Sequence, residues 1–172
     1  DYFSEHLTSR KLIYEVETGV NKSYSQIFEN ALGLVAGLEL EQGDRLTVIL
    51  PNSSAWVEYF LASMMGGWVF SPVPYFVQVQ ELDKILTYVS PKAIVTDRED
   101  INEKLGNKYK VLKVYQNQAS HKRYNRPNID ENAPAALYYS SGTTGNPKGV
   151  IYSHKNMTSL IASIIRGFKF SP

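Results

Sequence analysis

The sequence contains no cysteine, and this absence excludes several classes of protein at once. Without thiols there is no disulfide scaffold, no cysteine nucleophile and no zinc–thiolate site. The absence is compatible with a reducing compartment, so we expect a cytoplasmic protein. The formal net charge is only +1, so no overall field favours binding to nucleic acid or to an anionic membrane.

Long apolar runs are also lacking. The most apolar stretch, residues 60–70, contains Gly66 and Gly67 and is too short to span a bilayer. Nothing near Asp1 resembles a signal peptide, with its basic start and apolar middle. We find no internal repeat and no spacing typical of a metal site. The sequence therefore predicts a soluble protein with no transmembrane segment, no assigned metal ligand, and enough length, at 172 residues, for one good core.

What the sequence does contain is an alternation of strand and helix patterns. Short runs typical of strands occur at residues 46–50, 68–73, 93–96, 110–115 and 135–139. Helical patterns occur at residues 24–38, 54–65, 79–89 and 98–105. Such alternation requires crossover connections, which predicts an α/β fold: a largely parallel sheet with helices on both faces.

Some helix ends carry specific signals. Ser23 and Gln26 form a capping-box pattern ahead of the first of these helices. Ser53 or Ser54 is expected to cap the second helix, in which Glu58 is the only charge. Because that helix is apolar nearly all round, it should be covered on two sides.

Other segments give weaker expectations. We expect a short helix over residues 1–9 and an edge strand over residues 11–16. The basic residues at 121–126 lie in a long polar connection and are interpreted as a solvated surface rather than a nucleic-acid patch. Three large apolar side chains at and just after the end of the helix predicted at residues 54–65 could line a ligand tunnel. We interpret them as interior packing. They are Met64, Met65 and Trp68.

The most informative stretch follows the strand predicted at residues 135–139. It consists of Ser140-Ser141-Gly142-Thr143-Thr144-Gly145-Asn146-Pro147-Lys148-Gly149. Glycines let successive backbone N–H groups point into one concavity, and such concavities bind anions. The hydroxyl groups donate further hydrogen bonds, and Lys148 brings a mobile positive charge. A loop of this composition suits an oligophosphate.

Two other kinds of loop are compatible with parts of this stretch. The P-loop of nucleotide hydrolases needs Lys followed by Ser or Thr at the start of a helix. Here Gly149 follows Lys148, and residues 150–152 are typical of a returning strand. A plain hairpin is the second alternative, because Asn-Pro-Lys-Gly favours a type I turn. A hairpin alone would not need the hydroxyls and glycines ahead of that turn.

A final helix is predicted after the returning strand. Ser153 is its expected cap, and apolar residues follow at helical spacing from Met157 to Phe168. His154 lies in the first turn. We interpret it as a packing or loop-supporting residue, because no Asp or Ser partner is evident, and we assign no catalytic residue.

The loop closely resembles the phosphate-binding signature of the adenylate-forming superfamily, which comprises acyl-CoA synthetases, the adenylation domains of peptide synthetases and beetle luciferases. Ser140 stands where the family pattern has Thr and keeps the hydroxyl. Residues 55–74 also resemble the family, so the resemblance covers most of the chain beyond about Ser23. The residues that match the signature are Tyr139, Ser141, Gly142, Thr143, Thr144, Gly145, Pro147, Lys148 and Gly149.

The resemblance implies an ATP-dependent ligase that converts a small-molecule carboxylic acid into an acyl-adenylate and then passes the acyl group to coenzyme A. Magnesium (Mg²⁺) is implied as a cofactor beside ATP. The chain would be a partial N-terminal AMP-binding domain, with further machinery downstream, and inactive alone. The residues that would bind the β- and γ-phosphates are Ser140, Ser141, Gly142, Thr143, Thr144, Gly145 and Lys148.

Three alternatives remain open. The first is an adenylation domain that loads a carrier protein instead of coenzyme A. The second is another nucleotide-binding enzyme, such as a kinase or hydrolase, which would need the missing Lys-Ser or Lys-Thr pair. The third is a non-catalytic α/β interaction module.

Overall fold

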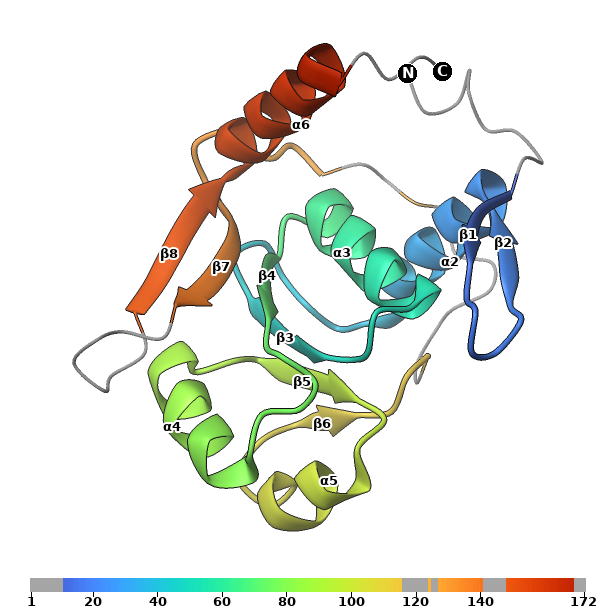
Figure 1. The fold of residues 1–172 in the computed structure, drawn as a ribbon. Helices are drawn as coiled ribbons and strands as arrows, with labels where there is room; N and C mark the ends of the chain where they lie inside the picture. The colour runs from blue at the N-terminus through green and yellow to red at the C-terminus, as the bar shows by residue number, and fades with distance from the viewer. Residues whose placement is uncertain (1–10, 116–123, 125–126, 141–147, 169–172) are drawn as a thin grey trace.

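The computed structural model describes residues 11–115, 124, 127–140 and 148–168 (Figure 1). Within these ranges the chain forms a six-stranded sheet, a separate two-stranded sheet and five helices. The short helix expected over residues 1–9 and the basic cluster at 121–126, apart from Tyr124, lie outside the described residues. In the part of the chain that is described, no helix is both long and apolar enough to cross a membrane.

The six-stranded sheet is mostly parallel. All neighbouring strands are parallel except the last two, which form an antiparallel hairpin. The predicted α/β fold with a largely parallel sheet is therefore confirmed. In spatial order the strands are β6 (Val111–Leu112), β5 (Ala93–Thr96), β3 (Arg45–Ile49), β4 (Val69–Pro72), β7 (Pro134–Ser140) and β8 (Lys148–Ser153).

Helices cover both faces of this sheet (Figure 1). Helices α2 (Tyr24–Gly37) and α3 (Ser54–Gly66) pack on one face, and α4 (Val79–Val89) and α5 (Glu99–Leu105) pack on the other. Strand β3 shows the alternation that this requires, because Leu46 and Val48 join the first cluster of buried side chains and Ile49 joins the second. Helix α6 (His154–Phe168) follows β8 at the edge of the sheet.

The predicted helix caps are present. The Ser23 hydroxyl accepts a hydrogen bond from the Gln26 backbone N–H at 3.3 Å, and the Gln26 side chain accepts one from the Ser23 N–H at 2.8 Å. Of the two candidates for the cap of α3, Ser53 is the cap, since its hydroxyl accepts from the Trp56 N–H at 3.3 Å. Helix α3 ends at Gly66 and is followed by the cap residue Gly67, whose φ of +72° is a conformation that favours glycine.

Two predicted strands differ from the structure. The strand expected at residues 11–16 is shorter: β1 (Lys11–Tyr14) pairs with β2 (Asn21–Ser23) in a separate two-stranded sheet, where it is an edge strand as predicted. The strand expected at residues 110–115 contains only Val111 and Leu112. Tyr115 leaves the extended conformation with a φ of +60°, and its N–H donates to the Tyr59 hydroxyl at 2.9 Å.

The single charge of α3 is fully buried. Glu58 accepts hydrogen bonds from Lys22 at 2.8 Å and from the Tyr115 hydroxyl at 2.5 Å. Asn30 of α2 donates to the same carboxylate at 2.9 Å. Since a buried carboxylate is stable only when it is paired, these contacts explain how α3 tolerates Glu58, and they attach the β1–β2 sheet to the core.

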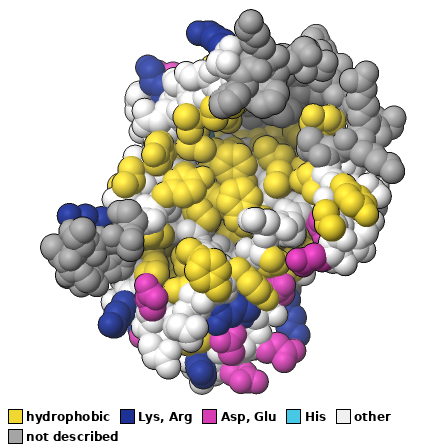
Figure 2. All heavy atoms as spheres, viewed as in Figure 1, with side chains coloured by type: hydrophobic (Ala, Val, Ile, Leu, Met, Phe, Trp, Pro, Cys, Tyr) yellow, Lys and Arg dark blue, Asp and Glu magenta, His cyan; other side chains and the backbone are white. Residues whose placement is uncertain are grey.

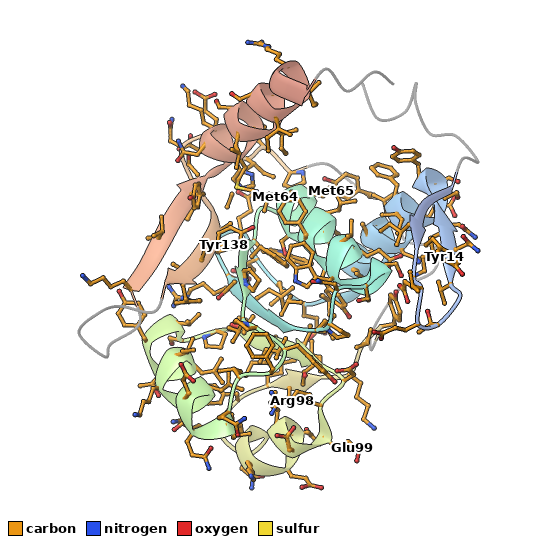
Figure 3. All side chains as sticks on the ribbon, viewed as in Figure 1. Tyr14, Met64, Met65, Arg98, Glu99 and Tyr138 are labelled. Carbon is orange, nitrogen blue, oxygen red and sulfur yellow. The ribbon has the colours of Figure 1, made fainter. Side chains whose placement is uncertain are left out.

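The expectation that α3 is covered on two sides is confirmed, because α3 packs against the sheet and against α2, and a third face stays partly open. Trp56, Phe60 and Met64 are half-buried, and Figure 2 shows apolar side chains gathered over the region that α3 occupies in Figure 1. Met64 and Met65 (Figure 3) pack against the first core cluster, and Trp68 is buried. The interpretation of these three residues as packing is therefore confirmed.

Candidate phosphate-binding site

The predicted phosphate loop connects β7 to β8. Ser140 is the last residue of β7, Lys148 is the first residue of β8, and the two are opposite each other in the antiparallel register. The Lys148 side chain is exposed. The structure thus brings together the two ends of the loop, while Ser141, Gly142, Thr143, Thr144 and Gly145 lie outside the described residues and remain predictions.

The hairpin stands at a favourable edge of the sheet. Strand β7 is parallel to β4, as β4 is to β3 and β3 is to β5. The carboxyl ends of these strands therefore meet at one edge, where open α/β sheets bind their ligands. Because β7 ends at Ser140, the loop begins at that edge.

Two residues shape the base of the loop. Tyr139 is half-buried, and its hydroxyl lies 3.1 Å from the hydroxyl of Ser71 on β4. Burial raises the pKa of Tyr139 to about 12, so the hydroxyl stays protonated at neutral pH. Opposite Tyr139 is Gly149, where a Cβ atom would lie 2.8 Å from Cδ1 of Leu137. A larger side chain at position 149 would force Leu137 to move.

The start of α6 holds the candidate histidine. Asn156 donates its backbone N–H to the Ser153 hydroxyl at 3.2 Å, so the predicted cap at Ser153 is present. His154 donates its backbone N–H to Ala133 at 3.1 Å, and its buried Nε2 has no hydrogen-bond partner among the described residues. Burial lowers the pKa of His154, so its imidazole is neutral at neutral pH. These contacts support a packing role.

Ser71 was not singled out from the sequence. The available signal was a hydroxyl residue inside the otherwise apolar pattern of residues 68–73. Searching the described residues for three or more His, Cys, Asp or Glu side chains that could hold a metal ion finds no such group.

A model of the AMP-binding enzyme family matches residues 5–172. The chain belongs to the AMP-binding enzyme family. Curated relatives of the chain include peroxisomal OPC-8:0-CoA ligase 1 of Arabidopsis thaliana, at 24% identity over 90% of the chain and 32% of the relative. A second is 4-coumarate–CoA ligase 3 of Arabidopsis thaliana, at 29% identity over 87% of the chain and 30% of the relative. Apicidin F synthase of Gibberella fujikuroi is 28% identical over 87% of the chain and 3% of its own length.

Solved structures share the fold of this chain. Apo MatB from Rhodopseudomonas palustris superposes with a TM-score of 0.84, at 22% identity over 95% of this chain and 36% of MatB. The McyG A-PCP structure, complexed with phenylalanyl-adenylate, has a TM-score of 0.82 at 23% identity, over 99% of this chain and 30% of McyG A-PCP. The chain spans about a third of the length of the curated ligases it matches, at 32% and 30%.

Proposed function

We propose that the chain supplies the phosphate-binding loop of a carboxylate-activating ligase that forms an acyl-adenylate from ATP and then an acyl-CoA thioester. The observation that carries the proposal is the β7–β8 hairpin, which holds Ser140 opposite Lys148 at the carboxyl edge of the parallel strands. Between these two residues in the sequence lies the run of hydroxyls and glycines that suits the phosphates of ATP. A cytoplasmic location belongs to the same proposal.

In this reaction a carboxylate oxygen attacks the α-phosphorus of ATP, the bond to the bridging oxygen breaks, and pyrophosphate leaves. Negative charge therefore grows on the β- and γ-phosphates as the transition state forms. The N–H and hydroxyl groups of the loop and the ammonium of Lys148 would stabilise this leaving group. The chain itself contributes binding and orientation of the phosphates rather than a proton acceptor.

Mg²⁺ and coenzyme A are part of the proposal. Hard oxygen ligands suit Mg²⁺, which is commonly held by one or two carboxylates together with the phosphates of the substrate. The phosphate oxygens of ATP would be among its ligands on this side of the site. When bound, Mg²⁺ supplies charge neutralisation of the pyrophosphate.

Lys148→Ala tests the role of the loop in the complete enzyme. Loss of the ammonium should lower carboxylate-dependent ATP–pyrophosphate exchange at saturating ATP by a factor on the order of ten to a thousand. Lys155→Ala is a matched control, because Lys155 is an exposed lysine on α6 that pairs with Glu131 at 2.7 Å. The control should exchange at the normal rate, and an unchanged rate in Lys148→Ala would favour a non-catalytic module.

Transfer to a carrier protein is the second candidate for the later half of the reaction. It is favoured by the similarity to Apicidin F synthase and to the McyG A-PCP structure. The two acceptors are distinguished by incubating the complete enzyme with ATP, a panel of carboxylic acids, and either coenzyme A or a phosphopantetheinylated carrier protein. Thioester formation on coenzyme A alone supports the first candidate, and acylation of the carrier alone supports the second.

A further inference from the structure

We propose that Tyr139 is a positioning residue for the phosphate loop and that it acts through its hydrogen bond to the buried Ser71. The proposal rests on the proposed function, because it concerns the same loop. It adds two residues, one of them outside the family signature, to the machinery that prepares the site for ATP.

The backbone connection between β7 and β4 is short. One register pair, Phe70 with Ala136, joins the two strands in the described structure. Pro72 ends β4 and has no N–H to donate, and the N–H of the following Val73 donates to Val48 of β3 at 3.0 Å. Beyond Ala136, therefore, β7 is paired through its backbone with β8 only. On the side of β4, the part of β7 towards Ser140 is held by side-chain contacts.

The Tyr139–Ser71 hydrogen bond supplies such a contact. Ser71 is 0% exposed, and the Tyr139 hydroxyl is 3.1 Å from it. Thr47, its register neighbour on β3, also has a buried hydroxyl, but this hydroxyl has no hydrogen-bond partner among the described residues. The Ser71 hydroxyl is therefore paired with Tyr139 and not with Thr47, and loss of the Tyr139 hydroxyl would leave a second unpaired hydroxyl in the interior.

Tyr139 is next to both ends of the loop. Tyr139 precedes Ser140 in β7 and is paired across the hairpin with Gly149, which follows Lys148. The site of a Cβ atom on Gly149 is 3.7 Å from the Tyr139 ring and 3.7 Å from the Tyr88 ring of α4. The Tyr139 ring, whose hydroxyl reaches Ser71 in the interior, and the largely exposed Tyr88 ring of α4 therefore both lie near the backbone of Gly149 at the base of the loop. A loop whose ends are fixed loses less conformational freedom on binding phosphate.

Removing the hydroxyl tests the proposal in the complete enzyme. Tyr139→Phe and Ser71→Ala should each raise the KM for ATP by about three- to tenfold, with a smaller effect on kcat and none on the KM for the carboxylic acid. The double variant should be no worse than either single variant, because both remove the same bond. Ser71→Thr keeps a hydroxyl and should restore most of the affinity for ATP.

Tyr138→Phe is the matched control. Tyr138 is the neighbouring residue of β7 (Figure 3), its ring packs edge-on against Tyr152, and within the described structure its hydroxyl has no hydrogen bond. This variant should have the KM values of the unmodified enzyme. An equal rise in the KM for ATP in Tyr138→Phe would overturn the assignment to the Tyr139–Ser71 bond.

A second measurement does not depend on activity. Hydrogen–deuterium exchange of residues 134–140 in the complete protein should become faster in Tyr139→Phe, while exchange in α2 and α3 stays unchanged. If the unmodified protein shows no ATP–pyrophosphate exchange with any acid, the proposed function fails. The hydrogen-exchange measurement still tests whether the Tyr139–Ser71 hydrogen bond holds the end of β7. Unchanged hydrogen exchange in Tyr139→Phe, or a fall in kcat with an unchanged KM for ATP, would overturn the proposal.

Discussion

Helices α4 and α6 have similar sequence patterns and very different surroundings. In α4, Leu82 and Leu86 are 0% exposed and Ile85 is 6% exposed. In α6, Leu160 and Ile161 are each 46% exposed. Both helices carry an apolar stripe at the spacing typical of an amphipathic helix. The comparison teaches that periodicity specifies which face of a helix is apolar, but not whether another part of the molecule covers that face.

The position of each helix in the fold explains the difference. Helix α4 connects β4 to β5 and lies on the sheet, where its stripe joins the second core cluster. Helix α6 follows β8, the edge strand, and among its apolar residues Met157 in the second turn is buried against the core. Figure 1 shows α6 standing beyond the end of β8, away from α4 and α5.

The largest expected effect compares one leucine from each helix. Leu82→Ala should lower the free energy of unfolding by about 2–5 kcal/mol, because it removes a fully buried side chain and leaves a cavity. Leu160→Ala should change it by less than about 0.5 kcal/mol, because that side chain lies at the surface, 46% exposed, and its removal leaves no closed cavity. Urea unfolding followed by circular dichroism measures both values. Equal losses would mean that the stripe of α6 is covered in solution.

A smaller effect compares the two serine caps. Ser53→Ala should lower the free energy of global unfolding by about 1 kcal/mol, since Ser53 caps α3 and α3 belongs to the core. Ser153→Ala removes the same kind of bond from α6. Because α6 packs chiefly through its first turns, the loss should appear as faster hydrogen exchange within α6 and leave global unfolding nearly unchanged. An equal global loss in the two variants would contradict the distinction between the helices.

The smallest expected effect concerns pH and His154, at the start of α6. Burial lowers the pKa of His154 below the ordinary value of 6.5, so near that pH the unfolded state binds more protons than the folded state. The folded state therefore keeps the full stability associated with neutral His154 above about pH 6.5. It loses this stability as the pH falls towards the folded-state pKa of His154. Between about pH 7.5 and about pH 5.5, His154→Leu should lose less stability than the unmodified protein. His6 and His121 are present in both the unmodified protein and His154→Leu. If the two proteins lose equal stability at low pH, His154 is not the cause of the loss.

The short-range features of the fold were predictable from the sequence. The capping box at Ser23 and Gln26 and the end of α3 near Gly67 depend on a few consecutive residues, whose backbone preferences act locally. The same is true of the strand at residues 93–96 and of the hairpin around the phosphate loop. The family followed from the loop signature, and the match over residues 5–172 confirms it.

What the tertiary structure alone decided are the contacts between residues far apart in the chain. The order of the strands, the separate sheet of β1 and β2, and the pairing of Glu58 with Lys22 and Tyr115 all belong to this class. The hydrogen bond between Ser71 and Tyr139 is another such contact. Local periodicity carries no information about such partners, because it records which side of an element is apolar and not which element lies against it. For the same reason the stripes of α4 and α6 look alike in the sequence, and only the position of each helix on the sheet decides that one is buried and the other exposed.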